Sequence, residues 1–362
     1  MEFRWPFKKK NHDQWIGIDL YKEAPSVVVQ SRACIEDCAS FNQQGMEALD
    51  QWLDHNIGAD APAVLVLDEA QYELLLVEAP EVPEEELAYA ISFRIADMLS
   101  QPIEDMAIQA FRLPPDAYRG RMNMAYVVAS PKETIRDIVS WAEKRRLKLE
   151  QITVPEMSLL QTLAAHNNAQ NSAILELKEG HGVIRLYSDG ALYLTRQVEV
   201  GFKALGFDAQ SDAETHAEEQ SEQQETLELS ADDISQELEE QSTDGVLLNE
   251  LDFDQLALEE TQAKDNIDDL QTENLILEIQ RSLDYYESQL GMGQINNLWV
   301  FSSQVDLSAL CEKIKPMIHT KAKQLDLNSS LPKAGVVDVS ASCEGLNNSL
   351  ISLGGALSYV AS

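Results

Sequence analysis

The chain has few cysteines, few basic residues and no long apolar run. Its four cysteines (Cys34, Cys38, Cys311 and Cys343) form no Cys-x-x-Cys pair and are accompanied by no His-x-x-x-His motif, which argues against a zinc site. No signal peptide is recognisable, so we expect free thiols in a reducing cytoplasm. No apolar stretch approaches the ~20 residues that cross a bilayer, and we therefore expect a soluble protein.

Acidic residues outnumber basic residues in the chain as a whole. Its 27 Lys and Arg face 62 Asp and Glu, which gives a formal net charge of −35. Such a chain is a poor binder of nucleic acid, whose affinity depends on neutralising phosphates. The acidic excess is greatest between residues 208 and 269, where 22 acidic residues face Lys264 alone. This composition predicts a solvated, disordered insertion.

Short apolar strands and one amphipathic helix follow each other in the same order in both halves of the chain. The first half predicts three strands, a helix and a strand at 15–20, 25–30, 32–36, 43–57 and 63–67. The second half predicts the same order at 172–177, 182–188, 191–200, 272–290 and 297–302. A βββαβ unit that occurs twice predicts a duplicated α/β fold with two similar lobes around a cleft.

A different pattern lies between the two units. Strands are predicted at 72–79, 105–112, 122–129 and 148–154, and helices at 84–99 and 132–146. This βαββαβ order is that of a split-βαβ domain. Leu87, Ile91 and Ile95 share one face of the first helix and should be buried. We expect these residues to form a small inserted domain.

Three stretches, together with this order of elements, resemble a known family. They are "LLLVEAPEVPEEELAYAISFRIADMLSQPIEDM" (74–106), "TVPEMSLLQTLA" (153–164) and "LEIQRSLDYYESQ" (277–289). In order and spacing they are similar to the PilM family of type IV pilus assembly proteins, which have the actin-like ATPase fold. The resemblance implies α/β lobes of the duplicated actin-like (ribonuclease-H-like) type with an inserted domain of the SHS2 type.

The resemblance also implies domain boundaries. The expected parts are an N-terminal tail (1–14), a first lobe (15–71, completed by 155–171 and a C-terminal helix at 345–362), an inserted domain (72–154) and a second lobe (172–344, interrupted by 208–269).

Actin-like ATPases hold Mg-ATP with three loops, and the resemblance implies where each should lie. The first phosphate loop should read Asp-x-Gly. Gly17 and Asp19 match the family's pattern, but Tyr21 stands at the position of the loop glycine. A side chain there blocks the close approach of a phosphate to the backbone. We therefore expect this loop to be degenerate.

The other two loops depart from the family pattern as well. The second phosphate loop offers Glu176 for the aspartate and Lys178 for the glycine, with Gly180 displaced. The adenosine loop should read Gly-Gly, and Ser302 and Ser303 stand there instead. We predict no cofactor, no metal and no catalytic residue, although ATP with magnesium stays open as the alternative. Lys178 could pair with a neighbouring carboxylate and close the cleft permanently.

The N-terminus, "MEFRWPFKKK", differs from the rest of the acidic chain. Its aromatic and basic residues are Phe3, Trp5, Phe7, Lys8, Lys9 and Lys10, together with Arg4. Such a segment could contact an anionic membrane surface, where each lysine contributes about 1 kcal/mol. It could equally fold onto a neighbouring groove of the protein, or remain a frayed terminus.

Two functions follow from the resemblance. In the first, the protein is a cytoplasmic scaffold, peripherally associated with the inner membrane, in the type IV pilus machinery. It would bind the cytoplasmic N-terminal tail of a bitopic PilN-like protein in a groove between the first lobe and the inserted domain, without acting as an enzyme. In the second, it is an active actin-like ATPase or an ATP-gated switch in pilus or type II secretion assembly.

Overall fold

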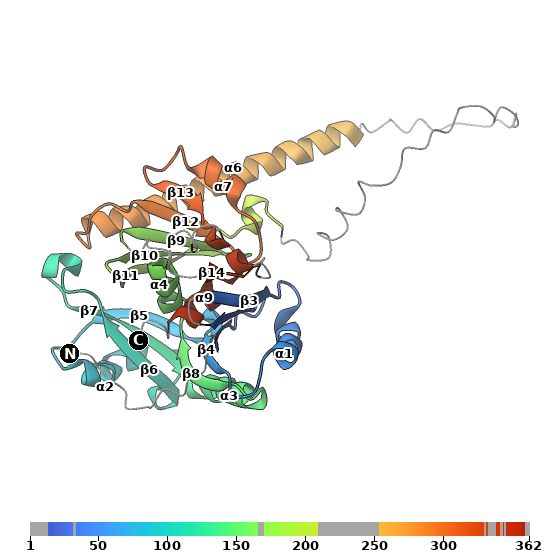
Figure 1. The fold of residues 1–362 in the computed structure, drawn as a ribbon. Coiled ribbons are helices and arrows are strands. Elements are labelled where there is room, and N and C mark those ends of the chain that lie inside the picture. The colour runs from blue at the N-terminus through green and yellow to red at the C-terminus, as the bar shows by residue number, and fades with distance from the viewer. Residues whose placement is uncertain are drawn as a thin grey trace, which may run out of the picture.

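The computed structural model describes most of the chain in two lobes and a smaller domain beside the first lobe (Figure 1). It describes residues 14–31, 34–165, 170–208, 253–328, 331, 338–340, 343 and 345–358, with the backbone alone for 253–268. The predicted membrane-contact residues of the tail lie outside this part of the chain. No helix within it is long and apolar enough to cross a membrane.

The first lobe is built on a six-stranded sheet of order β14-β3-β2-β1-β4-β8. Its strands are β1 (Gln14–Asp19), β2 (Ser26–Ser31), β3 (Cys34–Ser40), β4 (Pro62–Val66), β8 (Lys148–Thr153) and β14 (Asp338–Val339). The helices that accompany it are α1 (Gly45–Asn56), α3 (Lys132–Lys144), α4 (Pro155–Ala165) and α9 (Leu350–Leu357). β1, β2 and β3 are antiparallel, and β4 runs parallel to β1.

The second lobe repeats this arrangement in a five-stranded sheet of order β11-β10-β9-β12-β13. Its strands are β9 (Ser172–Leu177), β10 (Gly182–Ser188), β11 (Ala191–Val198), β12 (Asn297–Phe301) and β13 (Lys321–Gln324), with helices α6 (Phe253–Ser288) and α7 (Ser308–Ile314). β9, β10 and β11 are antiparallel, and β12 runs parallel to β9. The duplicated βββαβ unit expected from the sequence is therefore confirmed.

The inserted domain is smaller than the sequence predicts. Its three-stranded sheet, of order β5-β7-β6, consists of β5 (Glu73–Glu78), β6 (Met106–Arg112) and β7 (Met124–Pro131), and α2 (Glu84–Ile95) covers one face. Leu87, Ile91 and Ile95 are fully buried there, as their spacing predicts. β8 instead pairs with β4 in the first lobe, and α3 contributes Ile138 and Ala142 to the first-lobe core. The boundary at residue 154 is corrected accordingly.

Helix α6 begins earlier than expected. The prediction placed a helix at 272–290 and disorder at 208–269, but α6 starts at Phe253. Its first half extends away from the second lobe (Figure 1). Residues 253–288 contain no glycine or proline and are rich in good helix formers, so a helix nucleated on the lobe propagates outward. The remainder of the predicted insertion, 209–252, lies outside the described residues.

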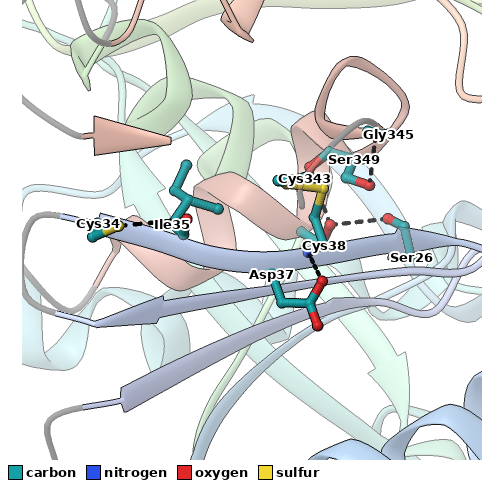
Figure 2. Close-up of a disulfide and its surroundings, with 9 residues drawn as sticks. Ser26, Cys34, Ile35, Asp37, Cys38, Cys343, Gly345 and Ser349 are labelled. Atoms are coloured by element: carbon teal, nitrogen blue, oxygen red, sulfur yellow. Dashed lines mark hydrogen bonds between the residues drawn. A yellow bond between two sulfur atoms is a disulfide. The ribbon is translucent and has the colours of Figure 1, made fainter. Parts of the chain in front are cut away.

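A disulfide joins two cysteines that the sequence predicts to be free. Cys38 on β3 bonds to Cys343, which precedes α9, across a sequence separation of 305 and with a Cα–Cα distance of 5.1 Å (Figure 2). Cys34 and Cys311 are free thiols. The pairing links β3 to the C-terminal segment, whose helix α9 packs on β1, β2 and α4 and completes the first lobe. Only the fold brings two such distant thiols together.

Candidate functional site

A buried arginine lies where the two lobes meet. Arg185 on β10 is fully buried and contacts three carboxylates. Its guanidinium donates to Glu176 on β9 at 2.7 Å, to Glu156 on α4 at 3.1 Å and to Glu69 at 2.9 Å. Glu69 belongs to the short 3-10 helix η1 (Glu69–Gln71) that follows β4. Arg185 therefore ties the second lobe to two elements of the first.

Lys178, at the turn after β9, forms a second link between the lobes. Its Nζ lies 3.1 Å from Glu69 Oε2 and 3.9 Å from Glu176 Oε1. The same ammonium group lies over the ring of Tyr21, 4.3 Å from the ring centroid. Burial lowers the pKa of Lys178, but the charges of Glu176 and Glu69 outweigh it, so the pKa is raised and the side chain stays charged. We call Glu69, Glu156, Glu176, Lys178 and Arg185 the buried charge cluster.

Two acids at this site differ in their protonation. Burial raises the pKa of Asp19, at the end of β1, to about 8, and Glu176 adds to the effect while Lys178 opposes it. Asp19 is therefore mostly protonated at neutral pH. Burial also acts to raise the pKa of Glu69, but the hydrogen bond from His181 and the charges of Arg185 and Lys178 hold it well below its usual range. Two buried acids of the same site thus have pKa values that are shifted in opposite directions.

The adenosine-loop candidates lie in a second contact between the lobes. Ser302 and Ser303 follow β12 and are buried. The Ser302 hydroxyl accepts a hydrogen bond from the backbone N–H of Gln304. The Gln304 carbonyl in turn accepts one from the side-chain amide of Asn42, in the first lobe, at 3.2 Å. Ser302 and Ser303 therefore belong to this second contact, and neither is a member of the buried charge cluster.

The two glycines proposed for the phosphate loops, Gly17 and Gly180, differ in their surroundings. A Cβ added to Gly17 would lie 1.8 Å from the carbonyl oxygen of Ser352 and 2.4 Å from the nitrogen of Ala356, both on α9. Gly17 is thus needed for close packing of α9 on β1, a reason for glycine at this position that does not involve a nucleotide. Gly180 has open space around its Cβ position, beside the turn that Lys178 begins.

A small cavity lies beside the buried charge cluster. Its volume is about 230 Å³, and it is lined in part by Glu69, Tyr72 and Glu156. That volume lies below the ~300 Å³ at which small-molecule sites begin. The Tyr72 hydroxyl already donates to Glu156 at 2.8 Å. A ligand entering this cavity would meet the carboxylates of Glu69 and Glu156, the Tyr72 hydroxyl and the side chain of Arg196.

Comparison with solved structures matches this architecture over almost the entire chain. No family model matches the chain, and the search of curated proteins finds no relative. A PilM-PilN type IV pilus biogenesis complex is similar with a TM-score of 0.64 and 16% identity, covering 95% of this chain and 98% of that one. The chain has the actin-like ATPase fold.

More distant similarities exist within this fold. The cytoplasmic domain of EpsL, an inner-membrane component of the type II secretion system of Vibrio cholerae, has a TM-score of 0.44 at 12% identity, covering 96% of this chain and 95% of that one. A protein of actin-like ATPase fold from Bacteroides thetaiotaomicron has the same TM-score at 10% identity, covering 90% and 95%.

A groove of about 570 Å³ lies in this actin-like molecule between the inserted domain and the first lobe. β6 is one of the two edge strands of the three-stranded sheet, and β8 is one of the two edge strands of the first-lobe sheet. Both contribute to the groove, whose apolar lining includes Leu67, Ile108, Phe111, Val128, Ile135 and Ile152. Among the described strands, β6 pairs only with β7 and β8 only with β4. We call it the edge groove.

The sequence analysis found part of this site and missed part. Asp19, Tyr21, Glu176 and Lys178 do come together at the junction of the lobes. Glu69, Glu156 and Arg185 were not singled out. The sequence did contain a signal for Arg185. It is the one charged residue of the strand "GVIRLYS", all of whose residues are buried. A charge in such a strand needs a buried partner.

Proposed function

We propose that this chain is a non-catalytic adaptor of the type IV pilus machinery, and that its edge groove binds the cytoplasmic N-terminal peptide of a PilN-like inner-membrane protein. The observation that carries the proposal is the edge groove itself. An extended peptide adds to a free sheet edge through main-chain hydrogen bonds, and apolar pockets select its side chains. The edge groove offers two such edges and an apolar lining.

The similarity to a PilM-PilN complex supports this class of partner. The matching sequence stretches favour, within that class, a component resembling MshI, which assembles mannose-sensitive haemagglutinin pili. Such an adaptor would lie in the cytoplasm against the platform that holds its membrane partner.

We further propose that the nucleotide site is degenerate and that the protein is a pseudo-ATPase. Tyr21 and Lys178 occupy the two positions where the phosphate loops need glycine, and they contact each other. Lys178 is already engaged by Glu69, so its charge is not available to a phosphate. The buried charge cluster then acts as a permanent link that holds the two lobes in one fixed arrangement.

The edge groove is tested by introducing a charge on its wall. Ile152→Arg places a guanidinium on β8, within the apolar lining. We expect affinity for the partner's N-terminal peptide to fall at least tenfold, which is about 1.4 kcal/mol, because the peptide's apolar side chains lose their contact surface. Isothermal titration with the synthetic peptide measures it.

A matched control for this variant exists on the second lobe. Leu277→Arg makes the same kind of exchange at a half-exposed apolar position of α6, away from the edge groove. It should leave peptide affinity unchanged. Equal affinity of the wild type and the Ile152→Arg variant, with both proteins folded, would place the partner elsewhere.

Partner binding is expected to be independent of nucleotide. Because Lys178 and Tyr21 fill the phosphate positions, the peptide affinity should be the same with and without millimolar Mg-ATP. The titration is repeated in both buffers, and equilibrium dialysis with labelled ATP measures nucleotide binding directly. A tenfold change in peptide affinity, about 1.4 kcal/mol of coupling, would instead support the ATP-gated switch in pilus or type II secretion assembly.

A further inference from the structure

Helix α2 of the inserted domain is apolar on both sides. Leu87, Ile91 and Ile95 are fully buried against the sheet. On the opposite side Tyr89 is 72% exposed and Phe93 is 71% exposed. A helix on the surface of a domain normally carries polar residues on its outer face. Two large aromatic side chains one turn apart are therefore not explained by the packing of this domain.

The two aromatic rings contact each other rather than the rest of the protein. Their centroids lie 5.1 Å apart at an interplanar angle of 88°, an edge-to-face pair. Met98, just beyond the helix, is 52% exposed and extends the apolar surface. Exposed apolar patches of this kind mark interaction sites more often than single exposed residues do. We call Tyr89, Phe93 and Met98 the α2 patch.

Acidic residues outnumber basic ones around the α2 patch. Glu85, Glu86 and Asp97 are exposed and form no ion pair with another residue of the described ranges. Glu84 is paired with Arg112 at 3.1 Å, and Arg94 donates to the carbonyl of Glu78. An anionic membrane surface would be repelled by this rim. The patch instead suits a segment that combines aromatic and basic residues.

One segment of this acidic chain has that composition. The sequence of residues 1–10 contains Phe3, Trp5 and Phe7 together with Arg4 and the three lysines 8–10. We propose that the α2 patch is the docking site of the chain's own N-terminal segment, with its aromatic residues on Tyr89 and Phe93 and its basic residues against the acidic rim. Cation–π contacts from Arg4 to the exposed rings fit the same pairing.

The length of the tether sets how far the aromatic residues of the segment reach. Phe7 and Phe3 lie seven and eleven residues before Gln14, where β1 begins in the first lobe. At ~3.3 Å per extended residue they reach up to about 23 Å and about 36 Å from Gln14. A tethered segment also has a high effective concentration at a site within its reach, so weak contacts suffice.

The experiment is site-specific photo-crosslinking in the full-length chain. Tyr89 is replaced by p-benzoylphenylalanine, and crosslinked peptides are identified by mass spectrometry in an equal mixture of ¹⁴N- and ¹⁵N-labelled protein. We expect crosslinks to residues 1–13 within chains of one label. The matched control carries the same photoreactive residue at Met122, which is 47% exposed in the same domain, and should give at least tenfold fewer.

Charge reversal in the tail tests the electrostatic part. Changing Arg4, Lys8, Lys9 and Lys10 to Glu should reduce the crosslink yield at least fivefold. Three results would overturn the proposal: equal tail crosslinking from positions 89 and 122, mixed-label crosslinks making up about half of the total as random pairing between chains requires, or an unchanged yield after charge reversal. Binding of the tail to phosphatidylglycerol vesicles without any crosslink at position 89 would also overturn it, and would assign the segment to a membrane surface.

Discussion

Replacing Arg185 with alanine is expected to lower the free energy of unfolding by about 3–5 kcal/mol. The guanidinium is fully buried and neutralises Glu69, Glu156 and Glu176. Its removal leaves buried carboxylates with Lys178 as their nearest cation, and an uncompensated buried charge is far costlier than the lost attraction alone. Urea denaturation followed by circular dichroism measures the change.

The loss should depend on pH in a defined direction. The charge of Arg185 is one of the causes that hold the pKa of Glu69 well below its ordinary value of 4.5 in the folded state. Without Arg185 that pKa rises, so the stability advantage of the wild type over the variant should shrink as the pH falls through and below about 4.5. Adding Glu156→Gln and Glu176→Gln to the Arg185→Ala variant should recover part of the loss at pH 8.

A surface arginine serves as the control. Arg281 pairs with Glu278 on α6 and is 62% exposed, so Arg281→Ala should change stability by less than about 0.5 kcal/mol. If Arg185→Ala were as mild as Arg281→Ala, the buried charge cluster would not hold the lobes together, and the rigid-adaptor interpretation would fail.

Gly17→Ala is expected to destabilise the first lobe by about 1–3 kcal/mol or more, although it adds a single methyl group. That methyl would overlap the backbone of α9 at Ser352 and Ala356, so the helix must move away from β1. α9 is buried along its whole length and also packs on α4, where Gly354 lies against Ser158. The helix therefore has no free direction in which to shift. Thermal unfolding of the two proteins measures the difference.

Gly180→Ala is the matched control for this prediction. The position has open space and no left-handed backbone conformation, so the same change should alter stability by no more than about 0.5 kcal/mol. The pair separates two interpretations of the glycine at position 17. If Gly17→Ala left stability intact while abolishing ATP binding, Gly17 would belong to a working phosphate loop after all.

The periodic parts of the fold were predictable from the sequence because they depend on local patterns. β9 and β10 have the predicted bounds, and the buried face of α2 follows from the spacing of Leu87, Ile91 and Ile95. β8 was assigned to the wrong sheet, because the sequence of a strand does not show which sheet edge it pairs with. The start of α6 was misplaced because acidic composition was taken for disorder, although its residues are also good helix formers.

The sequence by itself determined the duplicated α/β plan, the presence of an insertion and the absence of glycine at the phosphate positions. These are properties of residue type and order, which periodicity and motif spacing express directly. The tertiary structure alone decided the partners: Arg185 with its three carboxylates, Cys38 with Cys343, Gly17 with α9, and the two free edges around the edge groove. Such contacts join residues tens to hundreds of positions apart. They form because the packing of the sheets places these residues side by side, and a buried charge without a partner would be costly.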